Sequence, residues 1–151
     1  MYRVFIDGQA GTTGLQIHER LIAHPEIELL EIDPEERKNS DAKREITNLA
    51  DVVILCLPDE ASVKAVEDNK HSKARFIDTS TAHRTNSNWV YGFPELAQDQ
   101  RQKIASARLV SNPGCYPTGF LSAIRPLVDE NLLDHKALLT INALSGYSGG
   151  G

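Results

Sequence analysis

The sequence predicts an α/β fold built on a doubly wound parallel sheet. Three observations carry this prediction. Short apolar runs alternate with helix-like segments over the first 111 residues. The run DVVILCLP at residues 51–58 is almost continuously apolar and rich in β-branched residues, which is typical of a parallel strand covered on both faces. The chain has 151 residues, 40% of them hydrophobic, and can therefore bury a sizeable core.

The first two strands are expected near the N-terminus. Residues 2–7, YRVFID, form a short apolar run that stops at a glycine. A helical pattern follows, with apolar residues at Leu15, Ile17, Leu21 and Ile22. Residues 27–32 predict a second strand, which ends at Asp33 because Pro34 cannot donate to a ladder. The highly charged residues 34–45 are expected to form a solvated loop or a short helix.

The remaining elements of the sheet follow in order. Residues 51–58 form the third strand, and residues 59–70 form an exposed helix with apolar positions among charges. Residues 74–78 predict the fourth strand, residues 94–106 a helix, and residues 107–111 an extended segment. Because strands alternate with helices, we expect a parallel sheet with right-handed crossovers.

The last part of the chain predicts the start of a second, α+β domain. A helical pattern runs from Cys115 to about Asn131, and the apolar run KALLTINAL at residues 136–144 predicts a strand. The chain stops inside the glycine-rich stretch SGYSGGG with no closing element after it. We therefore expect a fragment of a longer chain, with this second domain truncated.

Charge and composition limit the classes of partner. A formal charge of -5 argues against a large nucleic-acid footprint, which normally needs a basic surface. The chain has neither an apolar run of about 18 residues nor a basic and apolar leader, so we expect no membrane partner and a cytoplasmic protein. Its two cysteines, Cys56 and Cys115, are then expected to be free thiols. We expect no metal site.

Three glycines mark a candidate nucleotide loop. Gly8, Gly11 and Gly14 lie between the first predicted strand and the first predicted helix, and Thr12 and Thr13 add hydroxyl donors. Such a turn allows close approach of the backbone to a diphosphate at the positive end of a helix. The spacing departs from G-x-G-x-x-G, and a glycine turn that only permits tight packing is the alternative.

We predict that residues 1–112, which contain the glycine loop, form a dinucleotide-binding domain. Residues 113–151 are predicted to begin a catalytic or substrate domain. The choice between NAD and NADP stays open at this level. Asp33 can accept a hydrogen bond from a ribose hydroxyl, whereas Arg37 and Lys38 can meet a 2′-phosphate.

Cys115 is the candidate nucleophile. It follows Gly114 and opens a predicted helix, whose positive end favours the thiolate over the thiol. Asn112 is expected to contact the substrate, with its amide near a developing oxyanion. Cys56 provides the contrast, because a cysteine inside an apolar strand behaves as a small hydrophobe and burial raises its pKa.

A nucleotide loop and an activated thiol together predict a reductive acyl-transfer enzyme. Hydride adds poorly to a carboxylate. A thiolate that captures an activated acyl group presents a more electrophilic carbonyl instead.

With these residues in hand, the chain resembles the N-acetyl-γ-glutamyl-phosphate reductase family, in its shorter form, which belongs to the aspartate-semialdehyde dehydrogenase superfamily. Four segments carry the resemblance and occur in the family's order: IDGQAGTTGLQI, DTSTAHR, SNPGCYPTG and SGYSGGG. The resemblance implies that Cys115 attacks an acyl phosphate. NADPH then reduces the thioester to N-acetylglutamate 5-semialdehyde, a step of arginine biosynthesis.

The resemblance also implies roles for other residues. The glycine loop corresponds to the family's NADP-binding loop, although Asp33 is a residue type that favours NAD. Ser148 and Gly149 correspond to a loop near the nicotinamide. Arg84 corresponds to an arginine that binds the substrate phosphate, with a surface arginine as the alternative. His83 beside it is expected to be merely solvated, as a loop histidine usually is, and it is not assigned the acid/base role because the family's acid/base histidine lies beyond Gly151. We also expect a homo-oligomer.

Two rival functions stay open. One is reduction of a different acyl phosphate, as in aspartate-semialdehyde dehydrogenase. The other is a non-catalytic NADP-binding module in which Cys115 is a redox sensor. Because the proton donor and much of the substrate wall lie outside this chain, we expect the 151 residues alone not to turn over substrate.

Overall fold

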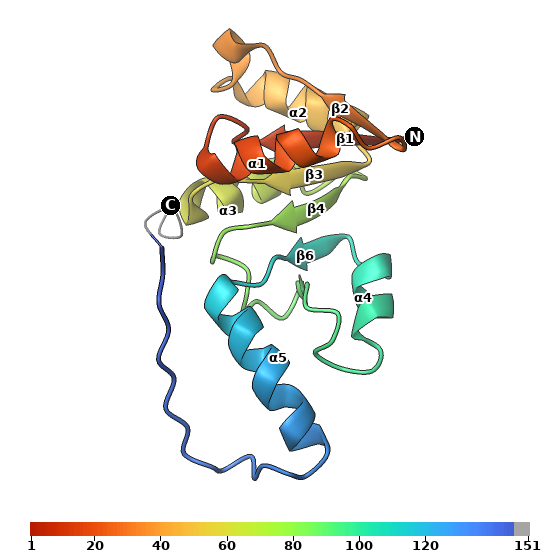
Figure 1. Cartoon of the computed structure of the whole chain (residues 1–151). Helices are drawn as coiled ribbons and strands as arrows, with labels where there is room; N and C mark the ends of the chain where they lie inside the picture. The colour runs from red at the N-terminus through yellow and green to blue at the C-terminus, as the bar shows by residue number, and fades with distance from the viewer. Residues whose placement is uncertain (147–151) are drawn as a thin grey trace.

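The computed structural model describes residues 1–146 and contains one six-stranded sheet in the order β2-β1-β3-β4-β6-β5 (Figure 1). Every pair of neighbouring strands is parallel. The strands are β1 (Tyr2–Asp7), β2 (Ile27–Leu30), β3 (Val52–Leu55), β4 (Arg75–Asp78), β5 (Val90–Tyr91) and β6 (Leu109–Ser111). The predicted parallel sheet is therefore confirmed. Ser148 and Gly149 lie outside the described residues.

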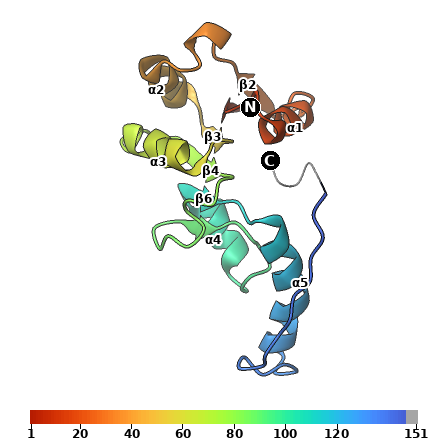
Figure 2. The same ribbon diagram turned by 90° about the vertical axis from the view of Figure 1, so that its left-hand side faces the viewer.

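Helices cover both faces of this sheet. Figure 2 shows α1 and α5 on one side of the strands and α2 and α3 on the other, which confirms the doubly wound arrangement. The helices are α1 (Thr12–Leu21), α2 (Ser40–Leu49), α3 (Asp59–Asp68), α4 (Gln100–Ser106) and α5 (Cys115–Asp129), with a short 3₁₀ helix, η1, at Pro34–Glu36. Among residues 1–146, no helix has the length and apolar character needed to cross a membrane.

The charged segment after β2 is more helical than its composition predicts. The side chain of Asn39 accepts hydrogen bonds from the backbone N–H groups of Asp41 and Ala42, so it caps α2. The helix continues to Leu49, because Thr47 is buried against the body of the protein. An N-cap and one buried face are enough to order a sequence that otherwise reads as solvated.

Two elements near the sheet edge differ from expectation. The helix predicted for 94–106 begins only at Gln100, whose side chain donates to the carbonyl of Tyr91 at 2.5 Å. The two-residue strand β5 was not predicted. It pairs with β6, and the Gly92 N–H extends the ladder to the Ser111 carbonyl at 2.8 Å. A strand of two residues is too short to show an alternating apolar pattern in the sequence.

The strand predicted for residues 136–144 is wrong. Residues 138–146 carry no regular secondary structure, and Figure 1 shows this stretch as a single trace that turns back beyond the far end of α5 and runs beside the body without joining the sheet. Leu138 and Leu144 are each 101% exposed. A strand needs a neighbour for its N–H and C=O groups, and no other described segment pairs with this one. The apolar pattern is present, but the partner strand is not.

The core lies between the sheet and the helices on its two faces. Its most buried members are large side chains from the three central strands: Phe5, Val53, Leu55 and Phe76. Because the strands are parallel, their carboxyl ends meet at one edge, where Asp7, Asp78 and Ser111 end β1, β4 and β6. This is the edge at which doubly wound sheets bind their ligands.

Candidate active site

The loop between β1 and α1 requires glycine at two of its three positions. Gly8 has φ +89°, and a Cβ there would lie 2.2 Å from the carbonyl oxygen of Cys56. A Cβ at Gly14 would lie 2.4 Å from the Gly8 carbonyl oxygen. The Gly11 N–H donates to that same oxygen at 3.0 Å, which closes the turn. The loop is thus folded tightly against the end of β3.

Gly11 differs, because its surroundings are open. The nearest atom to a Cβ built there is 3.5 Å away, and Gly11 is the N-cap of α1 with no side-chain cap. Thr12 and Thr13, which follow it, are exposed. The first N–H groups of α1 are therefore directed at open space, where an anion is favoured by the helix dipole. This arrangement fits the diphosphate of a dinucleotide.

A cleft of about 560 Å³ lies in front of this loop. It is lined by Gly11, Thr12, Thr13, Cys56, Leu57, Asp59, Thr79, Ser80 and Thr81. The cleft sits at the carboxyl edge of the sheet beside β1 and β3, where the strand order reverses. Open α/β sheets bind ligands at such a switch point.

Asp59 was missed by sequence reasoning. Its carboxylate accepts hydrogen bonds from the Thr81 backbone N–H, at 2.9 Å, and from the Thr81 hydroxyl. These hydrogen bonds lower the pKa of Asp59. The contact ties the start of α3 to the loop after β4 across the cleft. An acidic residue directly after a buried strand was the available signal, but its partner lies 22 residues away.

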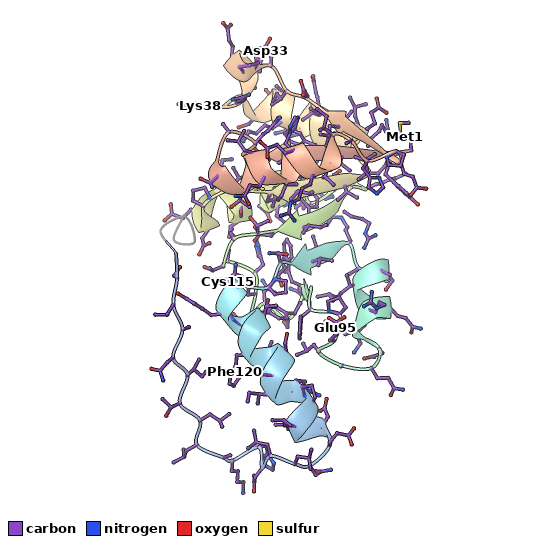
Figure 3. The ribbon with its side chains drawn as sticks, viewed as in Figure 1. Met1, Asp33, Lys38, Glu95, Cys115 and Phe120 are labelled. Carbon is purple, nitrogen blue, oxygen red and sulfur yellow. The ribbon has the colours of Figure 1, made fainter. Side chains whose placement is uncertain are left out.

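After β2, the residue expected to favour NAD and the residue expected to favour NADP lie in different surroundings. The Asp33 carboxylate accepts a hydrogen bond from the Glu35 N–H at 2.9 Å and caps η1. Figure 3 shows Asp33 at the outer tip of this loop. Arg37 instead lines a hollow that it shares with Gly8 and other residues of the glycine loop. Lys43, in the same hollow, is bound to Asp7, at 2.7 and 3.1 Å.

Cys115 is the first residue of α5, and it is exposed. Gly114 is the N-cap and supplies no side-chain acceptor, so the first N–H groups of the helix stay available to a ligand. In Figure 3, Cys115 lies at the end of α5 nearest the sheet. The thiol is therefore placed at the positive end of a 15-residue helix.

Arg84 lies against the same helix end. Its Nε donates to the Asn112 carbonyl and its Nη2 donates to the Thr79 carbonyl, each at 3.1 Å. The remaining nitrogen, Nη1, would lie 2.7 Å from a Cβ at Gly114. The Asn112 side-chain amide donates to the Pro113 carbonyl at 3.1 Å, within its own turn. The structure thus brings Arg84, Asn112 and Cys115 together around Gly114.

The expectation that His83 is merely solvated is wrong. His83 is 6% exposed, its Nδ1 lies 2.6 Å from Asp78 Oδ2, and its ring stacks on Trp89. The sequence offered no signal for this cluster, because no local pattern indicates that Asp78 and Trp89, on either side of His83 in the chain, would contact its ring. Only the folded loop brings the three side chains together.

Cys56 has the opposite environment from Cys115. Burial raises the pKa of its thiol to about 11, while a hydrogen bond with Thr79 acts in the other direction. The expected rise is confirmed. Cys56 nevertheless comes after the last residue of β3 and contributes to the wall of the cleft, which its apolar sequence context did not indicate.

Comparison with known proteins agrees with this architecture. Residues 33–104 match the family model described as semialdehyde dehydrogenase, NAD binding domain, and residues 115–151 match semialdehyde dehydrogenase, dimerisation domain. Among solved structures, aspartate semialdehyde dehydrogenase from Francisella tularensis covers 87% of this chain with a TM-score of 0.67 and 15% identity, over 42% of its own length. The aspartate semialdehyde dehydrogenase with NADP from Candida albicans covers 86% of this chain and 47% of its own, with a TM-score of 0.63 and 15% identity. These two likenesses show the fold.

Curated relatives are much closer in sequence. N-acetyl-gamma-glutamyl-phosphate reductase from Trichormus variabilis is 54% identical over 99% of this chain and 46% of its own length. The reductase of the same name from Brucella ovis is 52% identical over 99% of this chain and 48% of its own. The chain thus spans about half the length of these relatives, and the resemblance inferred from its four motifs is confirmed. It belongs to the semialdehyde dehydrogenase family, alongside relatives that are named N-acetyl-gamma-glutamyl-phosphate reductase.

Proposed function

We propose that the protein containing this chain reduces N-acetyl-L-glutamyl 5-phosphate to N-acetyl-L-glutamate 5-semialdehyde, with NADPH as reductant and release of phosphate. One observation carries the proposal. The exposed Cys115 and the guanidinium of Arg84 converge on the N-terminus of α5. A nucleophile and an anion-binding group therefore meet at one point, as attack on an acyl phosphate requires. The relatives at 52–54% identity are named N-acetyl-gamma-glutamyl-phosphate reductase, which indicates the acyl group of the proposed substrate.

The residues divide the reaction between them. The Cys115 thiolate attacks the acyl carbon, so that a C–S bond forms and the C–O bond to phosphate breaks. Arg84 and the free N–H groups of α5 stabilise the departing phosphate. The nicotinamide supplies a hydride when bound. After reduction of the thioester carbonyl, the C–S bond breaks, and Cys115 is regenerated as the aldehyde leaves.

The glycine loop and the hollow beside it support NADPH as the reductant. Gly8 and Gly14 form a cradle that a Cβ would fill, and Gly11 leaves the start of α1 open. Arg37 lies beside this loop, whereas the Asp33 carboxylate already caps η1. The Arg37 guanidinium beside the loop favours a 2′-phosphate over a ribose hydroxyl, and one oxygen of the Asp33 carboxylate is turned into its own turn.

The decisive experiment is mass spectrometry of a full-length protein that contains these residues, after incubation with the acyl phosphate in the absence of NADPH. We expect an acyl adduct on the Cys115 peptide and release of phosphate in equal amount. Aspartyl phosphate, tested in parallel, should give neither. An adduct on Cys56, or turnover without any adduct on Cys115, would contradict the mechanism.

Two properties of the whole protein follow from the same proposal. The match to a dimerisation domain over residues 115–151 supports a homo-oligomer. Because this chain spans about half the length of its relatives, we propose that the 151 residues alone do not turn over substrate. Steady turnover by the isolated chain, equal to that of a longer version, would contradict this.

A further inference from the structure

A buried carboxylate organises the loop that carries Arg84. Asp78, at the end of β4, is 0% exposed. It accepts hydrogen bonds from the Ser80 N–H at 3.0 Å and from the Ser80 hydroxyl at 2.7 Å. Its Oδ2 lies 2.6 Å from His83 Nδ1. In the Nδ1–H tautomer, His83 donates to this carboxylate as a third partner beside the two groups of Ser80. The loop after β4 is therefore wound around a single carboxylate.

The ring of His83 is held on its face as well as at its edge. It stacks on Trp89 with ring centroids 4.0 Å apart and an interplanar angle of 13°. Both residues are buried, and Trp89 belongs to the hydrophobic core. An apolar ring would fill this space without the desolvation that a buried polar pair incurs, so stability alone does not explain the pair.

The loop sets the direction of the neighbouring side chain. Arg84 follows His83 directly, and its backbone N–H donates to the Thr81 carbonyl at 3.3 Å. Two of its guanidinium nitrogens are engaged by backbone carbonyls, which leaves Nη1 beside Gly114 at the start of α5. A guanidinium fork binds phosphate well only when its plane is correctly oriented. A small rotation of the loop would turn it away from Cys115.

We infer that Asp78, His83 and Trp89 are positioning residues that aim Arg84 at the phosphate of the acyl phosphate. The inference rests on the proposed function, because it takes Arg84 as the group that binds the phosphate. The three residues do not touch the reacting atoms and act only through Arg84. Ser80 of the same loop lines the dinucleotide cleft, so their loss should weaken phosphate binding much more than NADPH binding.

The test uses His83→Phe in a full-length protein that contains these residues. Phenylalanine keeps a ring to stack on Trp89 but cannot donate to Asp78. Alkylation of Cys115 by iodoacetamide is followed by mass spectrometry at increasing concentrations of inorganic phosphate. We expect the phosphate concentration for half-protection to rise about tenfold, as for loss of a hydrogen bond to a charged group. The KM for acyl phosphate should rise with it, while the KM for NADPH changes much less.

Asp78→Asn provides a second variant of nearly the same shape, and it should give the same shift. The matched control is His71→Phe. His71 is exposed and lies between α3 and β4, at the edge of the sheet opposite to the Arg84 loop. We therefore expect His71→Phe to have the same half-protection concentration of phosphate as the wild type.

Arg84→Lys separates the two levels of the argument. If this variant protects Cys115 as well as the wild type does, the proposed role of Arg84 is wrong, and the positioning role falls with it. If Arg84→Lys weakens protection but His83→Phe and Asp78→Asn do not, only the positioning role is overturned. A fall in kcat with an equal loss of NADPH affinity in His83→Phe would show a purely structural role and would also overturn the inference.

Discussion

At the scale of single residues, the two cysteines show how position decides the chemistry of one side chain. Cys115 lies at the open, positive end of α5, whereas Cys56 is partly buried at the end of β3 and has a thiol pKa raised to about 11. The same functional group is thus exposed to solvent and backbone N–H groups in one place and held in its neutral form in the other.

This contrast predicts selective alkylation. At pH 8, iodoacetamide should modify Cys115 and leave Cys56 almost unmodified, since only the thiolate reacts. Because the pKa of Cys56 is raised, its alkylation rate should increase about tenfold per pH unit up to about pH 11. Peptide mass spectrometry across this pH range measures both rates. A rate for Cys56 that levels off near pH 9 in the folded protein would contradict the predicted environment.

A second prediction at this scale concerns Arg37. Replacing it by alanine should raise the Kd for NADPH at least about tenfold and leave the Kd for NADH unchanged, because a charge-assisted contact to the 2′-phosphate is lost. Calorimetric titration measures both constants. Arg44→Ala is the matched control, since Arg44 lies on α2 and pairs with Asp41. Equal weakening of both nucleotides would place Arg37 elsewhere in the cofactor site.

At the scale of elements, the strand-turn-helix unit formed by β1, the glycine loop and α1 depends on glycine for geometric reasons. The turn needs a positive φ at Gly8 and leaves no room for a side chain at Gly14. Not every glycine of the described residues has such a requirement. Gly119, inside α5, has no atom within 4 Å of the position that a Cβ would occupy.

These two kinds of glycine predict opposite effects of alanine. Gly8→Ala should lower the free energy of unfolding by about 3 kcal/mol or more, through backbone strain and a clash with the Cys56 carbonyl. Gly119→Ala should raise it by about 0.5–1 kcal/mol, because alanine favours a helix interior. Urea unfolding monitored by circular dichroism measures both. A tolerated Gly8→Ala would mean that the loop adopts another conformation.

At the scale of the whole molecule, the described structure consists of a packed sheet and an extended stretch that leaves its apolar side chains uncovered. Leu138 and Leu144 are completely exposed, and Ile141 is largely so. Several apolar side chains exposed along one segment mark a surface that another segment or another molecule normally covers. The strand predicted here is absent because the covering partner is absent from the described residues.

This stretch predicts self-association of the isolated 151-residue chain. The double substitution Leu138→Lys and Leu144→Lys should reduce binding of the dye ANS and shift the chain towards monomer in sedimentation, without lowering its stability, because neither side chain packs against the core. Val63→Lys, on the exposed face of α3, is the control and should change neither property. Unchanged self-association of the double variant would show that another surface mediates it.

Much of the fold was readable from sequence because its signals are local. The five longer strands and the two helices that open with the motif glycines and with Cys115 appear where apolar periodicity and breakers place them. The errors lie where the deciding contact is not local. Burial of Thr47 against the body lengthens α2, and a single ladder partner creates β5. Residues 136–144 form no strand because no partner lies among the described residues. The division of the chain between residues 112 and 113 stays a prediction.

By itself, the sequence determined which groups can react. A glycine loop after a strand, a cysteine at the start of a helix and an arginine in DTSTAHR are properties of residue type and local conformation. Only the tertiary structure decided how these groups meet. Residues 78–84 and 112–115 come together because β4 and β6 are neighbours whose carboxyl ends share one edge of the sheet. The partners of His83 and the surroundings of Cys56 likewise depend on contacts between segments distant in sequence, which no local pattern records.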